Sequence, residues 1–359
     1  MPDPGPPDTS QNGATLPCDA KGCLLQSKAG LCRVHSQLGT DALPRVCADF
    51  PRLINRIDDR LEVTGDLACP EIARLLMTQS GSEQIVELDE SVLTHRPVSG
   101  LQTRHAVPYI QVSNEIRNFV LTLLSLDGFT PTERLICALT FCAQTITHLH
   151  RNCSESDINA VVHIMEHLSD RRRLRAVTDL VMREPIAPDL AMTIIHHTVR
   201  LAAAKSETFK PLAEYAFRSY EGSRGQCEYD EIWNSYELRR AQVRSRLGQS
   251  IDEAFWRMTY HDWVHAPYVL SPTLAYHAVK LQLPVAVTRW LVYSQPAFIS
   301  ALSDDDDRAL KTKINEVIVD VTYKTARAIR HSNLLDVAQN VLKSVGLDHA
   351  SAALLLSRM

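Results

Sequence analysis

The feature that most restricts the fold of this chain is a helical spacing of apolar residues that begins near residue 109 and continues to the end. In residues 112–124, apolar side chains recur every three or four positions, as on the buried face of a helix. No strands alternate with these segments, which disfavours a parallel sheet. The sequence therefore predicts a mainly α protein with a multi-helix array as its body. Further predicted helices cover residues 130–149, 153–168, 188–201, 207–220, 228–247, 251–265, 271–282, 284–293 and 307–358.

Several of these helices carry recognisable end signals. Thr130 is followed by Pro131 and Glu133, which are the residue types of an N-cap, a first helical proline and a capping box. Residues 153–157 have a similar character and predict the start of the next helix. The basic residues 171–175 follow that helix, where positive charge complements the C-terminal end of the dipole. The same basic residues could instead dock an acidic surface of a protein substrate.

The composition is that of a folded, soluble protein, with 45% hydrophobic and 22% charged residues. A formal net charge of −4 gives no general attraction to nucleic acid or to an anionic membrane. No apolar stretch reaches the roughly 18 residues of a membrane span, and the first residues lack the pattern of a signal peptide. We therefore expect a cytoplasmic protein that binds neither nucleic acid nor membrane.

The nine cysteines are unevenly distributed, because five of them precede residue 70. In a reducing compartment such a local group is more typical of a metal or redox site than of a disulfide framework. Thiolates suit either zinc or an iron–sulfur cluster. The absence of a Cys-x-x-Cys pair makes a zinc ribbon less favoured without excluding zinc. The remaining four, expected to be buried or beside apolar helix faces, are Cys137, Cys142, Cys153 and Cys227.

Cys69 has the most informative local sequence of the five. Pro70, Glu71 and then an apolar run follow it, which predicts a helix that begins just after the sulfur. A thiolate at a helix N-terminus is stabilised by the dipole and by free N–H groups. The position therefore suits a metal ligand or a reactive thiol.

These observations predict four segments along the chain. Residues 1–17 are rich in proline and polar residues and are expected to be a disordered tail. Residues 18–78 form a small cysteine-rich metal-binding module, residues 79–108 a connector, and residues 109–359 the all-α domain. Within the connector, residues 84–88 are the place where a short strand pair is expected.

The sequence around the cysteines also carries a specific motif. GLCRVHSQLGTDALPRVCADFPR, followed by GDLACPEIARLLM, contains a Gly-Leu-Cys turn, then Cys-x-x-Phe-Pro-Arg, then Ala-Cys-Pro-Glu before a helix. In this order of motifs the chain closely resembles the flagellin lysine-N-methylase family, over about residues 18–76. Cys23 is similar to the family's preceding Cys-Pro-Phe-Leu, without the proline. The matching positions are Cys32, Gly39, Leu43, Cys47, Phe50, Pro51, Arg52, Cys69, Pro70 and Glu71.

This resemblance implies an S-adenosylmethionine-dependent protein-lysine N-methyltransferase that modifies flagellin, the protein of the bacterial flagellum. It also implies an iron–sulfur cluster, expected to be 4Fe–4S with zinc as the alternative, bound by the early cysteines. The family's further N-terminal cysteine-rich stretch has no counterpart here, yet five cysteines can still fill four cluster positions. The candidate metal ligands are Cys18, Cys23, Cys32, Cys47 and Cys69.

Methyl transfer to lysine requires a proton acceptor and a site for the methyl donor. A lysine amine has a pKa near 10.4, so its proton must be removed before it attacks the sulfonium methyl. No Gly-rich turn follows a strand, so the donor site is expected to be non-Rossmann, with binding beside the cluster as one option. The residue stretch 260–265 combines aromatic and titratable side chains, or alternatively packs Trp263 in the core. The sequence does not select among the candidate bases, which are Glu214, Tyr215, Asp230, Glu231, Asp262 and His265.

Two other functions fit the same sequence. The first is a non-catalytic interaction module that binds an iron–sulfur cluster or zinc. The second is a methylase of the same fold that acts on another protein. Metal content and methyl transfer to flagellin distinguish the three.

Overall fold

The computed structural model describes residues 18–19, 22–27, 31–87, 100–104, 106–221, 228–330 and 341–359, and all structural statements below concern these residues. The chain divides into two units, Met1–Phe50 and Pro51–Met359. The expected tail at residues 1–17 lies outside the described residues. The expected cysteine module at residues 18–78 includes parts of both units.

The first unit consists of short elements. Strands β1 (Cys18–Asp19) and β2 (Gly22–Cys23) pair in antiparallel orientation. Helix α1 (Arg33–Leu38), the 3₁₀ turn η1 (Thr40–Ala42) and helix α2 (Arg45–Asp49) follow. None of the described side chains in this unit is buried. The first unit therefore has no apolar core among its described residues.

The second unit begins with a β-hairpin that the sequence does not predict. Strands β3 (Arg52–Ile57) and β4 (Arg60–Gly65) pair antiparallel, with Ile57 opposite Arg60 next to the turn. The short strand β5 (Gly100–Leu101) adds to β3 in parallel orientation. The prediction of a strand pair in the connector is wrong for residues 84–87, because these residues form no strand. Residue 88 lies outside the described residues.

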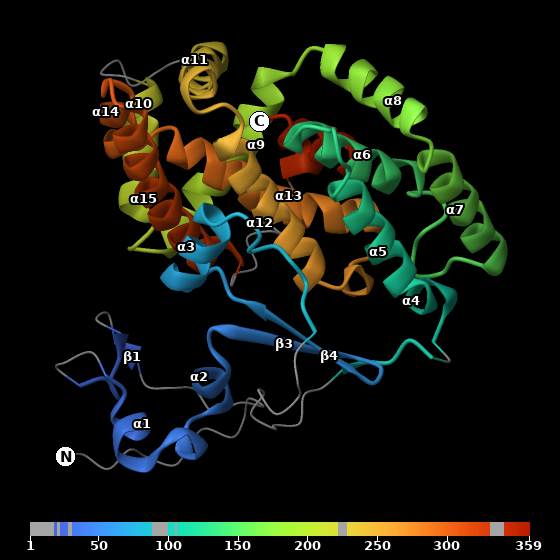
Figure 1. Cartoon of the computed structure of the whole chain (residues 1–359), viewed down its shortest axis with the longest axis horizontal. Helices are drawn as coiled ribbons and strands as arrows, with labels where there is room; N and C mark the ends of the chain where they lie inside the picture. Colours follow the sequence, from blue (N-terminus) through green and yellow to red (C-terminus); the bar gives the residue numbers. More distant parts are fainter. Residues whose placement is uncertain are drawn as a thin grey trace. The chain divides into compact units, whose positions relative to one another are not determined.

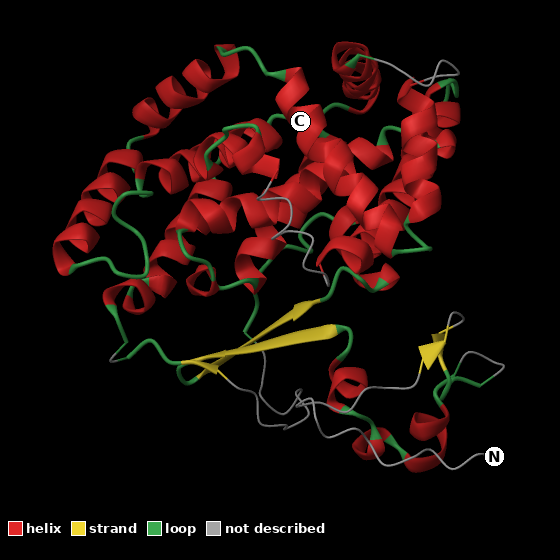
Figure 2. Cartoon of the chain, turned by 180° about the vertical axis from the view of Figure 1, so that it is seen from behind, coloured by secondary structure: helices red, strands yellow, loops and turns green. Residues whose placement is uncertain are grey.

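Helices make up most of the second unit, which confirms the mainly α class (Figure 2). Their N-terminal signals are also confirmed. The Thr130 hydroxyl accepts from the Glu133 N–H at 3.3 Å, and the Glu133 carboxylate accepts from the Thr130 N–H at 2.6 Å. Ser154 and Asp157 form a second capping box. The helical elements are α3 (Pro70–Thr78), α4 (Pro108–Gln111), α5 (Ser113–Leu124), α6 (Pro131–Gln144), α7 (Glu155–Leu168), α8 (Arg171–Arg183), α9 (Pro188–Lys205), α10 (Lys210–Glu221), α11 (Tyr229–Leu247), α12 (Ser250–His265), η4 (Tyr268–Leu270), α13 (Leu274–Val292), α14 (Pro296–Leu302), α15 (Asp307–Thr325), the π-helical turn η5 (Ala326–Arg330) and α17 (His349–Ser357).

Helix α13 runs through the middle of the helical array (Figure 1). It packs against α17, α15, α12, α6 and α9, and nearly all of its side chains are buried. The sequence predicts two helices here, at residues 271–282 and 284–293, but Pro284 lies inside one continuous helix. Proline removes one backbone hydrogen bond and normally interrupts a helix. Burial on every side holds the two halves together despite that loss.

The basic residues 171–175 do not simply follow a helix, because they form the first turns of α8. The guanidinium groups of Arg171 and Arg175 donate to the carbonyls of Asp127 and Gly128. Arg175 also lies 3.7 Å over the Phe129 ring and pairs with Glu133 at 2.8 Å. These two arginines therefore hold the loop before α6. No helix within the described part of the chain is both long and apolar enough to cross a membrane.

Candidate functional site

The backbone of the first unit brings three cysteine positions to one small loop. Cys18 lies opposite Cys23 in the β1–β2 pair. A tight turn follows, in which the Gln26 N–H donates to the Cys23 carbonyl at 3.0 Å. Gln26 then forms an isolated antiparallel bridge with Cys32, and the Arg33 N–H donates to the Leu25 carbonyl at 2.9 Å. Residues 18, 23 and 32 are therefore joined through consecutive backbone pairings.

The remaining cysteine of the first unit is Cys47, which lies on α2 and is exposed. Its N–H donates to the Pro44 carbonyl at 2.9 Å. Cys23 and Cys32 are half-buried free thiols. In the first unit, the thiols of Cys23, Cys32 and Cys47 are therefore at least partly accessible and are not packed in a core.

This unit fits a thiolate-bound metal centre in two respects. Its donors are the soft sulfur ligands that zinc and iron–sulfur clusters prefer. A segment of this size without an apolar core usually needs a metal or disulfide cross-link to fold. Among the described side chains, however, no three His, Cys, Asp or Glu groups are already placed close enough to hold one ion. The fit therefore rests on the backbone and on the donor type.

Cys69 belongs to the second unit and is the N-cap residue of α3, as predicted. Its extended backbone (φ −86°, ψ 124°) places it just outside the helix, and Pro70 occupies the first helical turn. The Cys69 N–H donates to the Asp66 carbonyl at 3.0 Å, and the Ala68 N–H donates to the Asp66 carboxylate at 2.8 Å. We refer to residues 66–69 as the Cys69 turn.

A buried ion pair lies beside the Cys69 turn. Arg327 donates from its Nε to the Ala68 carbonyl at 2.9 Å. Three residues later, Arg330 donates two hydrogen bonds to the Asp262 carboxylate, one of them at 2.6 Å. Burial raises the pKa of Asp262, but the positive charge of Arg330 and hydrogen bonds from Arg330 and His261 outweigh it, so the pKa lies below its ordinary value. Asp262 is therefore a buried carboxylate rather than a neutral acid.

Two histidines complete this cluster at the end of α12. The Nδ1 of His265 lies 3.0 Å from the Thr64 hydroxyl, and the His265 carbonyl accepts from Asn55 at 2.7 Å. Burial and the neighbouring His261 lower the pKa of His265 to about 4, so its ring is neutral at pH 7. The His261 Nδ1 lies 3.5 Å from Asp262, and its Nε2 is buried without a hydrogen-bond partner among the described residues. We name Asp262, Arg330, His261 and His265 the Asp262 cluster.

The candidate bases therefore fall into three places. Asp262 and His265 come together, with Asp262 buried and paired with Arg330 and His265 half-buried beside Thr64. Trp263 packs in the core with 1% of its surface exposed. Glu214 and Tyr215 lie on α10, and Asp230 and Glu231 in the first turn of α11. Arg330, Thr64 and Asn55 could not be found from the sequence, because no local signal links them to α12. Asp262 is thus paired with Arg330, and it is Arg327, three residues before Arg330, that binds the Cys69 turn.

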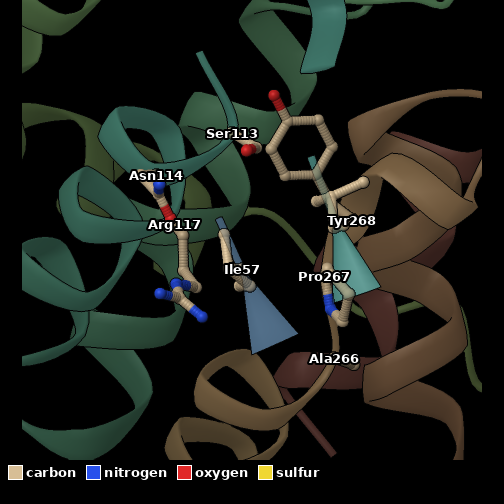
Figure 3. A pocket seen from close by; sticks show the side chains of 8 residues that line it. Ile57, Ser113, Asn114, Arg117, Ala266, Pro267 and Tyr268 are labelled. Atoms are coloured by element: carbon tan, nitrogen blue, oxygen red, sulfur yellow. The ribbon is translucent and has the colours of Figure 1, made fainter. Parts of the chain in front are cut away.

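Two depressions stand out on the described part of the second unit. One is lined by residues that include Ile57, Arg117 and Tyr268, and its accessible volume of about 10 Å³ admits about one water molecule (Figure 3). Arg117 is held there by an ion pair with Glu62 at 2.6 Å. The other is an open groove of about 270 Å³ between α9 and α10, and it includes Glu214. Only the second has the size to take part of a small molecule.

The later cysteines behave as packing residues. Cys137, Cys142 and Cys153 are buried, as expected, and Cys227 lies outside the described residues. Burial raises the pKa of the Cys137 thiol to about 12, so it carries no thiolate at neutral pH. Cys137, Cys142 and Cys153 are therefore core residues in the described part of the chain.

Comparison with known protein families, with curated proteins and with solved structures finds no match. The resemblance to the flagellin lysine-N-methylases therefore stays a prediction that rests on the cysteine motif.

Proposed function

We propose that this protein is an S-adenosylmethionine-dependent protein-lysine N-methyltransferase of the flagellin-modifying type, with an iron–sulfur cluster bound by its early cysteines. The observation that supports it most is the first unit itself, which has four cysteines and no buried side chain among its described residues. A bound cluster would supply the cross-link that this unit lacks. The ligands would be four of Cys18, Cys23, Cys32, Cys47 and Cys69.

Cys69, the candidate ligand that lies in the second unit, is held in position by its own surroundings. Arg327 holds the Cys69 turn by a hydrogen bond to the Ala68 carbonyl. Arg330, which pairs with Asp262 on α12, lies in the same short helical turn η5 as Arg327. Because Asp262 is ionised, Arg330 stays neutralised in its buried setting. Asp262 is therefore a positioning residue in this proposal and not a proton acceptor.

In the methyl transfer itself, the total charge of the reactants and products would be the same. The unprotonated lysine nitrogen attacks the sulfonium methyl, the methyl–sulfur bond breaks, and S-adenosylhomocysteine leaves. The proton that the ammonium must lose passes to a base or to water. The sulfonium loses its positive charge in this step, and the substituted amine gains one.

The first test is metal content after anaerobic purification. We expect about four irons and four acid-labile sulfides per chain, and loss of most iron in Cys32→Ala and Cys47→Ala. Cys153→Ala is the matched control, because Cys153 is buried and distant in sequence from the motif, and it should retain its iron. If the protein contains zinc and no iron, the metal centre is a zinc site and not an iron–sulfur cluster. If it contains no metal, the proposed metal-binding module is wrong.

The second test is transfer of labelled methyl groups to flagellin by the metal-replete protein. Label in flagellin lysines supports the methylase. A metal-replete protein that labels no flagellin contradicts it and leaves the non-catalytic interaction module as the function. Label in a different protein would keep the enzyme class and change the substrate.

A further inference from the structure

Helix α11 has an exposed face that carries no charged side chain over its middle turns. The helix packs on α9, α10 and α15 and lies at the edge of the helical array (Figure 1). The exposed positions of this face recur at helical spacing and are Asn234, Leu238, Ala241, Gln242 and Ser245. Leu238 lies in the middle and is 61% exposed. The exposed face of α8, in contrast, has Arg172, Asp179 and Arg183.

The charges of α11 lie at its two ends and have opposite signs. Asp230 and Glu231 are in the first turn, just after Glu228 at the N-cap, and Arg244 and Arg246 are in the last turn. This order complements the dipole of the helix itself. It also decides how two copies of α11 could lie side by side. Parallel copies would place like charges together at both ends, whereas antiparallel copies would place opposite charges together.

The spacing of the charges fits an antiparallel pair. Asp230 and Arg244 are about four turns apart at ~3.6 residues per turn, so they lie on nearly the same side of the helix. Glu228 and Arg246 are about five turns apart and also share one side. Both pairs are centred on residue 237, next to Leu238. A two-fold rotation about this centre brings the acidic member of each pair to the basic member in the other copy.

The groups that this pairing needs are accessible in the second unit. Glu228 and Asp230 are exposed, and no ion pair among the described residues involves either of them. The Nε of Arg244 and that of Arg246 each donate to a carboxylate of the same chain, yet 43% and 23% of these side chains are exposed. Partly solvated ion pairs add little energy and mainly set the orientation. Burial of Leu238 and the short side chains beside it supplies the attraction.

We propose that α11 is the interface of a homodimer in which two copies of the helix pair antiparallel about a two-fold axis next to Leu238. The occupant is a second copy of this chain, because the face is complementary to itself. Short side chains at Ala241 and Ser245 let the two helices approach closely. A single helix face buries under about 1,000 Å² in total, so the dimer is weak and forms as the protein concentration rises. The inference does not depend on the proposed methylase function.

The first test is sedimentation velocity of the full-length protein, purified anaerobically with a thiol reductant so that no intermolecular disulfide contributes. Between about 1 µM and about 200 µM we expect the mass to rise from that of one chain, 40.2 kDa, toward that of two. Leu238→Arg should stay monomeric over the whole range. Leu180→Arg is the matched control, because Leu180 is 63% exposed on α8, and it should dimerise as wild type does.

An exchange of charges tests the antiparallel arrangement. Asp230→Arg and Arg244→Asp should each weaken dimerisation about tenfold, and the double variant should recover to within about threefold of wild type. Circular dichroism checks that each variant is folded. If Arg244→Asp does not fold, Glu228→Arg combined with Arg246→Glu gives the same comparison.

Two results overturn the interface: a protein that stays monomeric at the highest concentration, and a dimer that Leu238→Arg leaves intact. Double variants that do not recover overturn the antiparallel register.

Discussion

At the scale of single residues, Asp262 shows why the sequence predicts only part of a site. The sequence stretch 260–265 indicated titratable groups next to aromatic ones, and Asp262 and His265 do lie together. Their role could not be predicted, because the partner that defines it, Arg330, is 68 residues away in the chain. A buried carboxylate with a bidentate arginine is a structural ion pair. The same carboxylate without the arginine would be a candidate base.

Replacing Asp262 by asparagine should destabilise the second unit by about 3 kcal/mol, because it leaves the Arg330 charge without its partner in a mostly buried setting. The measurement is urea unfolding followed by tryptophan fluorescence. Glu71→Gln is the control, because Glu71 pairs with Arg74 in an exposed i, i+3 bridge, and it should change the free energy of unfolding only slightly. Equal losses in both variants would contradict the role given to the Asp262 cluster.

At the scale of elements, the helix starts were the most predictable feature and the strands the least. A capping box is encoded by residues three positions apart, so Thr130 and Glu133 could be identified from the sequence alone. The β3–β4 hairpin turns at Asp58 and Asp59 without the Asn-Gly or Asp-Gly signal of a tight turn. Asp58 instead adopts a positive φ of 51°, and its carboxylate accepts from the Thr103 N–H at 2.7 Å. That support comes from a distant segment, so local sequence could not reveal the hairpin.

The capping box of α6 gives a prediction at the same scale. Thr130→Ala should lower the free energy of unfolding by about 1 kcal/mol, because the Glu133 N–H loses its acceptor at the helix N-terminus. Thr122→Ala is the control, since the Thr122 hydroxyl only donates to the Asn118 carbonyl within α5. Urea unfolding of both variants checks the difference. A loss in Thr122→Ala as large as in Thr130→Ala would argue against a specific capping effect.

At the scale of the whole molecule, three neutral histidines, two of them buried and one half-buried, make the second unit less stable in acid. Burial is the main cause that lowers the pKa of His196 and His265 to about 4 and that of His277 to about 3. The same residues in the unfolded chain titrate near 6.5. Below that pH the unfolded state binds protons that the folded state does not, so stability falls as pH decreases toward the folded pKa values.

We therefore expect the free energy of unfolding to fall between about pH 6.5 and pH 4, by up to about 1.4 kcal/mol per pH unit for each of these histidines. Urea titrations at several pH values measure the slope, and all four tryptophans lie after residue 50, so their fluorescence reports the second unit. His277→Gln should flatten the slope. His163→Gln, at a histidine with 79% of its side chain exposed, should leave it unchanged. A slope that His277→Gln does not alter would contradict this account.

Helix α13 has a consequence for how this chain tolerates mutation. Apart from Tyr276 and the exposed Lys280, every residue of α13 is buried, so the helix has almost no solvent-facing positions at which replacements are harmless. A saturation mutagenesis library should therefore show that most substitutions along residues 274–292 impair folding. In α8, where only Leu174 and Thr178 are buried, the tolerance of substitutions should instead vary with the period of the helix. Variation among natural versions of this protein would accumulate on the outer helices and leave α13 almost invariant.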